Sequence, residues 1–471
     1  MNIIRKLVGQ TATYGLSSII GRLLNYLLVP IYTRVFLPEE YGVVTELYAY
    51  VAFFAVMLTY GLETAYFRFV SNQDLTSKDK ATVYSTSLIS LIATSSIFLI
   101  IIYFFSLEIA SSIGYSENIK YIEWLSIIIA IDAVSSIPFA RLRNENKALR
   151  FAIIRVLNIL VNISLNLYFI LYLKYGIEYI FIANLISSLI TIILLSPQMF
   201  DAGLTFSMKL WRKMMIYALP LLFAGLAGIT NEVIDRILLK SYILDTGNAM
   251  YEIGLYGAFY KLSIIMILFI QTFRYAAEPF FFNQKSTKNN KAIYADVMKY
   301  FIVVMSVIFL IVTIFYDFFQ MFLGPEYHDQ RGFKVVSILL LANFFLGIYY
   351  NLAIWYKLTD KTIYGAGLSF LGAIITITFN IILIPFLGFV GSAWATLGCY
   401  STMTICSYFL SKRFFPIDYN LSRIGLYFIS MLSIYLCTYF INMWFNALLL
   451  LLFVILVLFL EKNEFKRYSY K

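Results

Sequence analysis

Residues 443–460 read MWFNALLLLLFVILVLFL and contain no acidic or basic side chain. About 20 predominantly apolar residues in an α-helix are long enough to cross the hydrocarbon core of a bilayer. Charged side chains are expensive at that depth, so their absence over such a length is typical of a spanning helix. The stretch therefore predicts a transmembrane helix, and the rest of the chain can be compared with it.

Runs of the same kind recur throughout the 471 residues, of which 61% are hydrophobic and 13% charged, with a mean hydropathy of +0.80. Soluble domains are about half apolar and about one quarter charged. We therefore predict an all-α integral membrane protein with about fourteen transmembrane helices. The predicted spans are 10–33, 42–68, 83–105, 120–140, 151–173, 178–197, 215–239, 254–282, 295–316, 335–356, 363–385, 389–410, 424–441 and 443–460.

The 36 lysines and arginines are distributed unevenly between the two sides of these helices, giving a net charge of +10. With the N-terminus in the cytoplasm, every inner segment carries at least two basic residues. Only the longest outer loop, near 317–334, carries as many. Lys299 is counted in the inner segment that follows the predicted span 254–282. This positive-inside bias predicts a multi-pass protein of the bacterial inner membrane with both termini cytoplasmic. Short basic clusters between apolar runs favour contact with anionic lipids and predict no nucleic-acid partner.

An internal repeat relates the two halves at an offset of 214 or 215 residues. The matching positions are Tyr41-Gly42 with Tyr256-Gly257, Glu63 with Glu278, Arg22 with Arg236, Lys147 with Lys361, and Asn166 with Asn380. Six predicted helices separate the partners, so both halves enter the membrane in the same direction. The pattern predicts two six-helix lobes as parallel repeats with a cleft between them, at 1–205 and 206–414. Residues 415–471 would add two transmembrane helices and a cytoplasmic tail.

Several loose motifs occur in a characteristic order, beginning with Tyr14-Gly15, Val29-Pro30 and Glu40-Tyr41-Gly42. They continue with Leu219-Pro220, Asp235-Arg236, and the segment from Asn380 to Thr396 that contains Gly388, Gly391 and Ala393-Trp394-Ala395-Thr396. In this order and spacing, residues 7–410 resemble the polysaccharide (O-antigen type) flippases of the multidrug/oligosaccharidyl-lipid/polysaccharide exporter superfamily. The resemblance implies that an isoprenoid-pyrophosphate-linked oligosaccharide crosses to the outer leaflet by alternating access between two lobes. Its implied partners are that lipid-linked oligosaccharide, membrane lipids and other glycan-assembly proteins.

Two arginines lie inside predicted helices at matching positions of the repeat. Arg22 and Arg236 are candidate substrate-binding residues, since guanidinium groups bind phosphate oxygens through a planar fork. The alternative for Arg22 is a structural pair with a carboxylate such as Glu46. Arg236 has Glu232 one turn before it, which favours a structural pair there. Asp235, adjacent in sequence, is expected to point to another face and is a candidate for gating or ion coupling.

Further charged candidates lie in the predicted spans 42–68 and 254–282. Lys261 and Arg274 are candidate substrate-binding cations, although Glu278 lies one turn beyond Arg274 and an ion pair between them is the stronger expectation. Glu63 and Glu278 are candidates for gating or ion coupling. For Glu63 a gating ion pair with Arg141 or Arg143 is favoured over a proton or sodium site.

The middle helices of the first lobe carry a carboxylate, an arginine and a stripe of amides. Asp132 is the first candidate for coupling if H⁺ or Na⁺ drives transport, and Arg155 is expected to snorkel to the inner surface. Asn158, Asn162 and Asn166 repeat at intervals of one turn, so they share one helix face. Contact between helices is the default role of such a stripe. Asn162 and Asn166 are also candidates for contact with sugar hydroxyls.

The sequence contains no motif for catalysis or for a cofactor. His328 is the single histidine, the three cysteines lie in apolar segments, and no phosphate-binding glycine loop is present. We therefore expect neither an enzyme nor a bound cofactor. A drug or cation exporter and a lipid II flippase of the same superfamily remain alternatives, and a membrane glycan polymerase is a more distant one.

Overall fold

The computed structural model describes residues 23–24, 26–71, 76–200, 203, 205–243, 248–284, 290–359 and 361–469. Within these ranges the chain folds into helices and contains no β-strand. Eleven of the helices are long and apolar enough to cross a membrane. The all-α membrane fold predicted from the sequence is thus confirmed, whereas most of the predicted span 10–33 lies outside the described residues.

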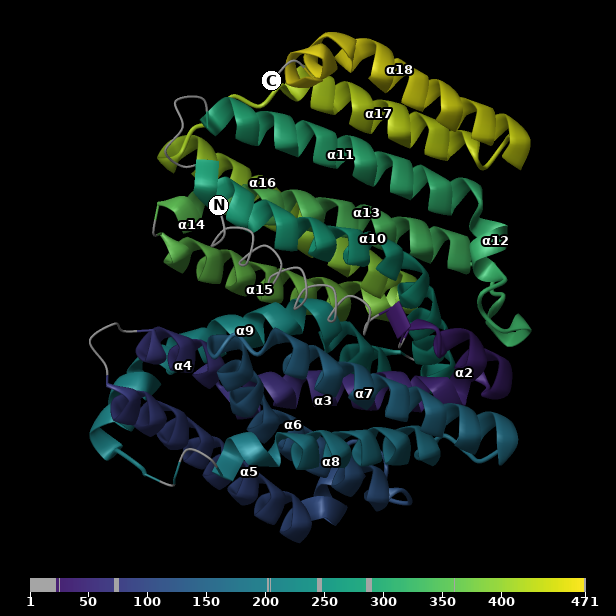
Figure 1. Cartoon of the computed structure of the whole chain (residues 1–471). Coiled ribbons are helices and arrows are strands. Elements are labelled where there is room, and N and C mark those ends of the chain that lie inside the picture. Colours follow the sequence, from purple (N-terminus) through teal and green to yellow (C-terminus); the bar gives the residue numbers. More distant parts are fainter. Residues whose placement is uncertain are drawn as a thin grey trace. The chain divides into compact units, whose positions relative to one another are not determined.

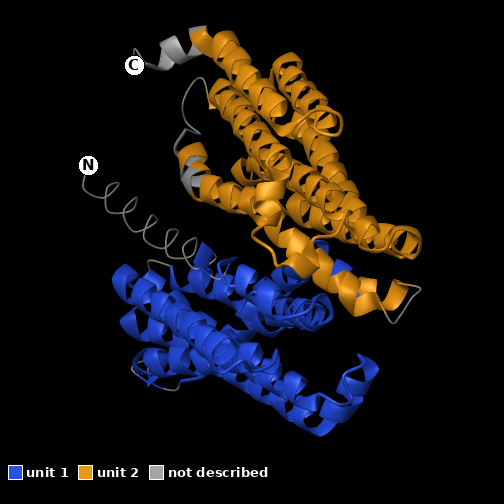
Figure 2. Ribbon diagram, turned by 90° about the vertical axis from the view of Figure 1, so that its right-hand side faces the viewer, with its two compact units in different colours: residues 1–237 blue, residues 238–471 orange. Residues whose placement is uncertain are grey.

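The chain forms two compact units, Met1–Ile237 and Leu238–Lys471 (Figure 2). The helices of unit 1 are α2 (Val29–Val35), α3 (Pro38–Thr59), α4 (Leu62–Val70), α5 (Ser77–Ser112), α6 (Ile119–Asn144), α7 (Ala148–Asn166), the π-helix η1 (Leu167–Tyr172), α8 (Glu178–Phe200) and α9 (Met208–Tyr242). The division falls inside α9, later than the boundary at 205 that the repeat predicts. The lobes of the repeat stay a prediction.

Unit 2 contains the remaining helices (Figure 1). They are α10 (Ala249–Gln284), α11 (Asn290–Ile314), α12 (Tyr316–Gln320), the 3₁₀-helix η3 (Pro325–Tyr327), α13 (Gly332–Leu352), α14 (Ile354–Leu358), α15 (Thr362–Leu387), α16 (Phe389–Phe414), α17 (Leu421–Cys437) and α18 (Met443–Ser469). Most bounds lie within a few residues of the predicted spans, because bilayer thickness sets the length of each helix. α17 is shorter than the other apolar helices.

Unit 1 is organised around α6, which packs against α3, α5 and α8. α3 and α4 together form one span, interrupted at Tyr60 and Gly61, both of which have positive φ angles. A Cβ atom at Gly61 would lie 2.9 Å from the Cβ of Leu221. Glycine therefore meets two demands here, the left-handed backbone and the close approach of α9.

Unit 2 is organised around α13, which packs against α10, α11 and α16, while α15 packs against α16. α17 and α18 join this bundle through α11 (Figure 1). The tight connection between α15 and α16 is made by Gly388, whose φ angle is +55°. The two helices beyond the predicted repeat pack mainly against α11. Phe428 of α17 also contacts the rings of Phe344 and Phe345 of α13.

Candidate functional site

A polar cavity of about 320 Å³ lies inside unit 1, bordered by residues of α4, α6, α7 and α8. Its lining includes one acid and one base from the middle helices, Asp132 and Arg155, together with serine, threonine and asparagine side chains. Charged groups within a membrane are costly unless they face a cavity or one another. Their concentration around one cavity makes it the candidate functional site.

Asp132 projects from α6 into this cavity and remains accessible there. Its Oδ1 accepts a hydrogen bond of 2.9 Å from the Ser188 hydroxyl on α8. Among the described residues, this carboxylate has no ion pair within 4.0 Å. A carboxylate in such a position can take up and release a cation, which is what the sequence-based hypothesis requires of Asp132.

Arg155 lies on α7 with its guanidinium 4.1 Å above the centre of the Phe139 ring, and Phe151 lies 5.7 Å away. It borders the same cavity as Asp132. Whether Arg155 snorkels to the inner surface stays a prediction. Cation–π contact with these two rings stabilises the guanidinium at the border of the cavity.

The asparagine stripe of α7 connects this helix to α8. Asn158 Nδ2 donates to the Ser187 carbonyl at 3.0 Å and to Thr191 Oγ1 at 2.8 Å. Asn162 Nδ2 makes a longer contact of 3.4 Å with Ser187 Oγ. These bonds fit the expected role of amides between membrane helices.

Asn166 ends the stripe and is 1% exposed. Its Nδ2 donates to the Asn162 carbonyl at 2.8 Å, and its Oδ1 accepts from the Tyr32 hydroxyl of α2 at 2.8 Å. Its side chain is thus engaged within the protein. Contact of Asn162 or Asn166 with sugar remains an untested hypothesis.

Glu63 of α4 and Arg143 of α6 form an ion pair at the border of the cavity. Arg143 is one of the two partners, Arg141 or Arg143, that the sequence predicts for Glu63. Arg141 instead pairs with Glu145 at 2.6 Å, one turn further along α6. Whether the Glu63–Arg143 pair acts as a gate stays a prediction.

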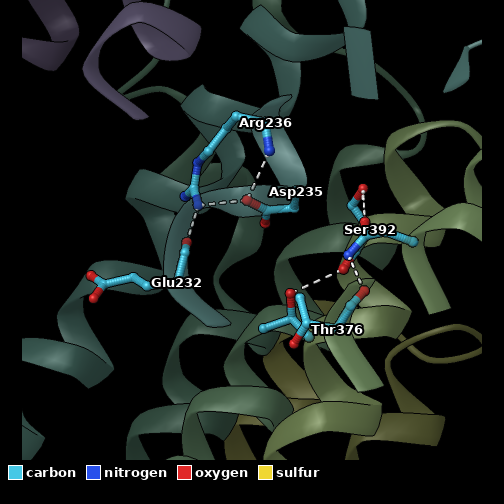
Figure 3. Close-up of polar contacts among 7 residues, drawn as sticks. Glu232, Asp235, Arg236, Thr376 and Ser392 are labelled. Atoms are coloured by element: carbon cyan, nitrogen blue, oxygen red, sulfur yellow. Dashed lines mark hydrogen bonds and ion pairs between the residues drawn. The ribbon is translucent and has the colours of Figure 1, made fainter. Parts of the chain in front are cut away.

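Asp235 and Arg236 contact each other directly in α9 (Figure 3). Arg236 Nη1 donates to Asp235 Oδ1 at 2.8 Å and also to the Glu232 carbonyl oxygen, and both charged side chains are buried. The expectation that Asp235 points away from Arg236 is therefore wrong. The long arginine side chain folds back along the helix, so adjacent residues can pair despite leaving the helix in different directions.

The other predicted site residues are less well defined. Arg22 lies outside the described residues, and so does the side chain of Glu278. Lys261 is half-buried in α10. Arg274 lies 4.0 Å above the Tyr350 ring, and its expected pair with Glu278 remains untested.

A buried ion pair in unit 2 was not anticipated. Lys299 Nζ of α11 lies 2.6 Å from Glu461 Oε2 of α18, and the Tyr427 hydroxyl of α17 donates to the same carboxylate. Lys299 is 3% and Glu461 2% exposed. Lys299 therefore lies buried in α11 and not in a loop, whereas its place on the cytoplasmic side stays a prediction. The position of Lys299 within the predicted span 295–316 is the feature of the sequence that could have indicated a buried lysine.

The described part of the chain contains no group of three or more histidine, cysteine or acidic side chains that could hold a metal ion. The cavity of unit 1 instead offers two acids, Glu63 and Asp132, together with hydroxyls, amides and two guanidiniums. This set can bind a monovalent cation or transfer a proton.

The fold is shared with solved membrane transporters. It matches an inward-facing multidrug resistance MATE family transporter of the MOP superfamily with a TM-score of 0.69 and 16% identity, over 83% of this chain and 94% of that one. It matches the lipid II flippase MurJ, in an inward closed conformation, with a TM-score of 0.67 and 18% identity, over 97% and 99%. At this level of identity the matches show that the chain shares the fold of these two proteins.

A comparison of the sequence with protein-family models identifies the family of this chain. The family model described as "polysaccharide biosynthesis protein" matches residues 7–285. The chain belongs to this family, and the resemblance found in its motifs is confirmed. No curated protein sequence matches it significantly.

Proposed function

We propose that this protein flips an isoprenoid-pyrophosphate-linked oligosaccharide from the cytoplasmic to the outer leaflet of the bacterial inner membrane. Its membership of the polysaccharide biosynthesis family is the observation that carries the proposal. The shared fold with a protein named a lipid II flippase supports it, because that name gives a lipid as the molecule that is flipped. Alternating access between two lobes would move the polar glycan through the membrane.

Transport is coupled to protons through Asp132. The carboxylate lies in a polar cavity inside the membrane and accepts a hydrogen bond from Ser188. Arg155 borders the same cavity, and its positive charge disfavours a sodium ion that also needs several oxygen ligands. A proton needs only the carboxylate. If sodium is the coupling ion instead, a sodium gradient will drive transport where a proton gradient does not.

Both termini lie in the cytoplasm, as the distribution of basic residues predicts. Reporter fusions near Lys80, Lys147 and Arg212 should report the inner side, and fusions near Glu117 and Asp329 the outer side. A single inverted loop would contradict this orientation.

Complementation tests the proposed activity. A host that lacks its own flippase should regain surface glycan when it produces this chain together with the glycosyltransferases that make the substrate. These glycosyltransferases are the expected glycan-assembly partners of the protein. Drug export is the second candidate, because the fold is shared with a multidrug transporter. A host that gains drug resistance but no surface glycan would favour that alternative.

A further inference from the structure

The polar cavity of unit 1 follows one face of α6 towards the C-terminal end of that helix. Asp132, Ser136 and Arg143 all line it. Their intervals of four and seven residues place these three side chains on the same helix face. Eleven residues separate Asp132 from Arg143, which corresponds to about 16 Å along the helix axis. The cavity therefore joins a carboxylate in the middle of a predicted span to the end of α6 that the charge pattern places in the cytoplasm.

The polar side chains along this cavity are open to it. Asp132 of α6 and Arg155 of α7 are exposed, and Ser136 of α6 and Asn158 of α7 are partly exposed. A cavity lined by several hydroxyl, amide and charged groups has the polar partners that water molecules need. Water in such a cavity can carry a proton to or from the carboxylate of Asp132.

Glu63 and Arg143 form their ion pair at the end of the cavity away from Asp132. The side chain of Glu63 is 40% exposed and that of Arg143 35%, so the pair lies at the protein surface and borders the cavity at once. We call this end of the cavity its mouth. The guanidinium of Arg143 also lies 4.8 Å from the centre of the Phe67 ring. Arg143 of α6 thus contacts α4 at two points beside the mouth.

The backbone around Glu63 is held in place, so opening of the mouth depends on side chains. Glu63 follows the break at Tyr60 and Gly61 by two residues, and Gly61 lies close to Leu221 of α9. An ion pair between partly exposed side chains contributes little to stability. Glu63 and Arg143 can therefore separate and pair again without a movement of their helices.

Four charged side chains line the described part of this cavity: the acids Glu63 and Asp132 and the bases Arg143 and Arg155. The charges of Glu63 and Arg143 compensate each other at the mouth. If Glu63 were neutral, Arg143 would repel cations that approach the mouth and attract anions. A change in charge at the mouth and a change in its width therefore have different effects on cationic and anionic probes.

We infer that this cavity is the path by which Asp132 exchanges protons with the cytoplasm, and that the Glu63–Arg143 pair closes its mouth. On release, the proton passes from the carboxyl group of Asp132 to water in the cavity, and the carboxylate keeps its hydrogen bond from Ser188. Separation of Glu63 from Arg143 opens the mouth to this water. The physiological role of the path rests on the proposed function, whereas access to the cavity can be measured without transport.

Cysteine labelling of the full-length protein in membrane vesicles tests the direction of the path. All three native cysteines are replaced by alanine, and Ser136→Cys places a single thiol inside the cavity. Two membrane-impermeant methanethiosulfonates serve as probes, one with a trimethylammonium group and one with a sulfonate group. We expect Ser136→Cys to react from the inner side, in inside-out vesicles, and not in right-side-out vesicles. Reaction from the outer side alone, or from neither side, would overturn the inference.

Two exposed positions calibrate the sidedness of the vesicles. Lys147→Cys should react from the inner side and Glu117→Cys from the outer side, since both residues are exposed outside the predicted spans. An inverted pattern at these two positions would place the mouth on the outer side and contradict exchange with the cytoplasm.

Glu63→Gln tests whether the ion pair closes the mouth. We expect it to raise the labelling rate of Ser136→Cys at least fivefold with both probes. Glu145→Gln is the matched control, because Glu145 pairs with Arg141 at the same end of α6 and neither residue lines the cavity. The double variant Glu63→Arg/Arg143→Glu should restore the slow rate, since it rebuilds the pair with the charges exchanged.

Faster labelling by the sulfonate probe with slower labelling by the trimethylammonium probe would mean that Glu63→Gln changes only the charge, and this result would refute the gate. Unchanged rates with both probes would refute it as well. Flipping is scored separately in the same membranes. A wild-type chain that does not flip its substrate would count against the proposed function and leave the labelling result intact.

Discussion

Asn166 and Asn380, 214 residues apart in the chain, make the same two kinds of hydrogen bond in separate units. Each donates Nδ2 to the carbonyl four residues earlier, Asn162 or Thr376, at 2.8 Å. Each accepts a hydroxyl at Oδ1, from Tyr32 in unit 1 and from Ser392 in unit 2, again at 2.8 Å. Figure 3 includes the contacts of Thr376 and Ser392. This correspondence supports the repeat predicted from the sequence.

The repeat predicts equal consequences when either asparagine is lost. Asn166→Leu and Asn380→Leu should each destabilise the protein by about 1–3 kcal/mol, because a buried hydroxyl loses its acceptor. Thermal unfolding in detergent measures both variants, with Asn118→Leu in the loop between α5 and α6 as a control. A large loss of stability in one variant and none in the other would show that the two positions are not equivalent.

Asp132→Asn should abolish the dependence of transport on a proton gradient, because an amide cannot take up the proton. The rate of lipid-linked oligosaccharide flipping in vesicles, with and without a pH difference, measures this effect. Asp418→Asn is the matched control, since Asp418 is exposed between α16 and α17. A response to the gradient that persists in Asp132→Asn would place the coupling site elsewhere.

Arg22 tests whether a cation of the first helix holds the pyrophosphate. Arg22→Ala should abolish export at normal protein levels, since losing one charge-assisted contact costs about 1.5–3 kcal/mol, or about tenfold to a hundredfold in affinity. Arg22→Lys should be intermediate, because lysine keeps the charge without the planar fork. Surface glycan and membrane abundance are measured together. Normal export by Arg22→Ala would refute the role, and loss of the protein from the membrane would make Arg22 structural.

The buried pair of Lys299 and Glu461 should hold α18 against α11. Lys299→Met alone should destabilise the protein by about 3–5 kcal/mol, because it leaves a buried carboxylate without its partner charge. The double variant Lys299→Met/Glu461→Leu should recover most of that loss. Unfolding temperatures of the single and double variants give the coupling between the two residues. Additive effects would mean that the pair contributes little.

The helices could be predicted from the sequence because lipid demands about 20 apolar residues for each span. The pairing of Glu63 with an arginine of the 141–143 segment could also be predicted, since both lie near the inner ends of predicted helices. The direction of individual side chains could not be predicted from the sequence. Asp235 and Arg236 were assigned to different faces from their spacing, but a long flexible arginine can reach back to its neighbour.

Interactions between distant helices were the hardest to predict. The sequence places Lys299 near the inner end of a predicted span, which suggests a charge on the cytoplasmic side. Nothing in the sequence connects Lys299 with Glu461, 162 residues later. The cavity beside Asp132 likewise combines residues of α4, α6, α7 and α8. Such sites depend on packing, which hydropathy and charge patterns do not specify.

Flipping in a reconstituted system tests the central claim most directly. Purified protein is placed in vesicles with a fluorescent isoprenoid-pyrophosphate-linked oligosaccharide in both leaflets, and a membrane-impermeant glycosidase is added outside. We predict that the fraction of labelled glycan open to cleavage rises from about one half, the outer leaflet alone, towards completion. A fraction that stays at the level of protein-free vesicles under proton and sodium gradients of either direction would contradict the proposed function.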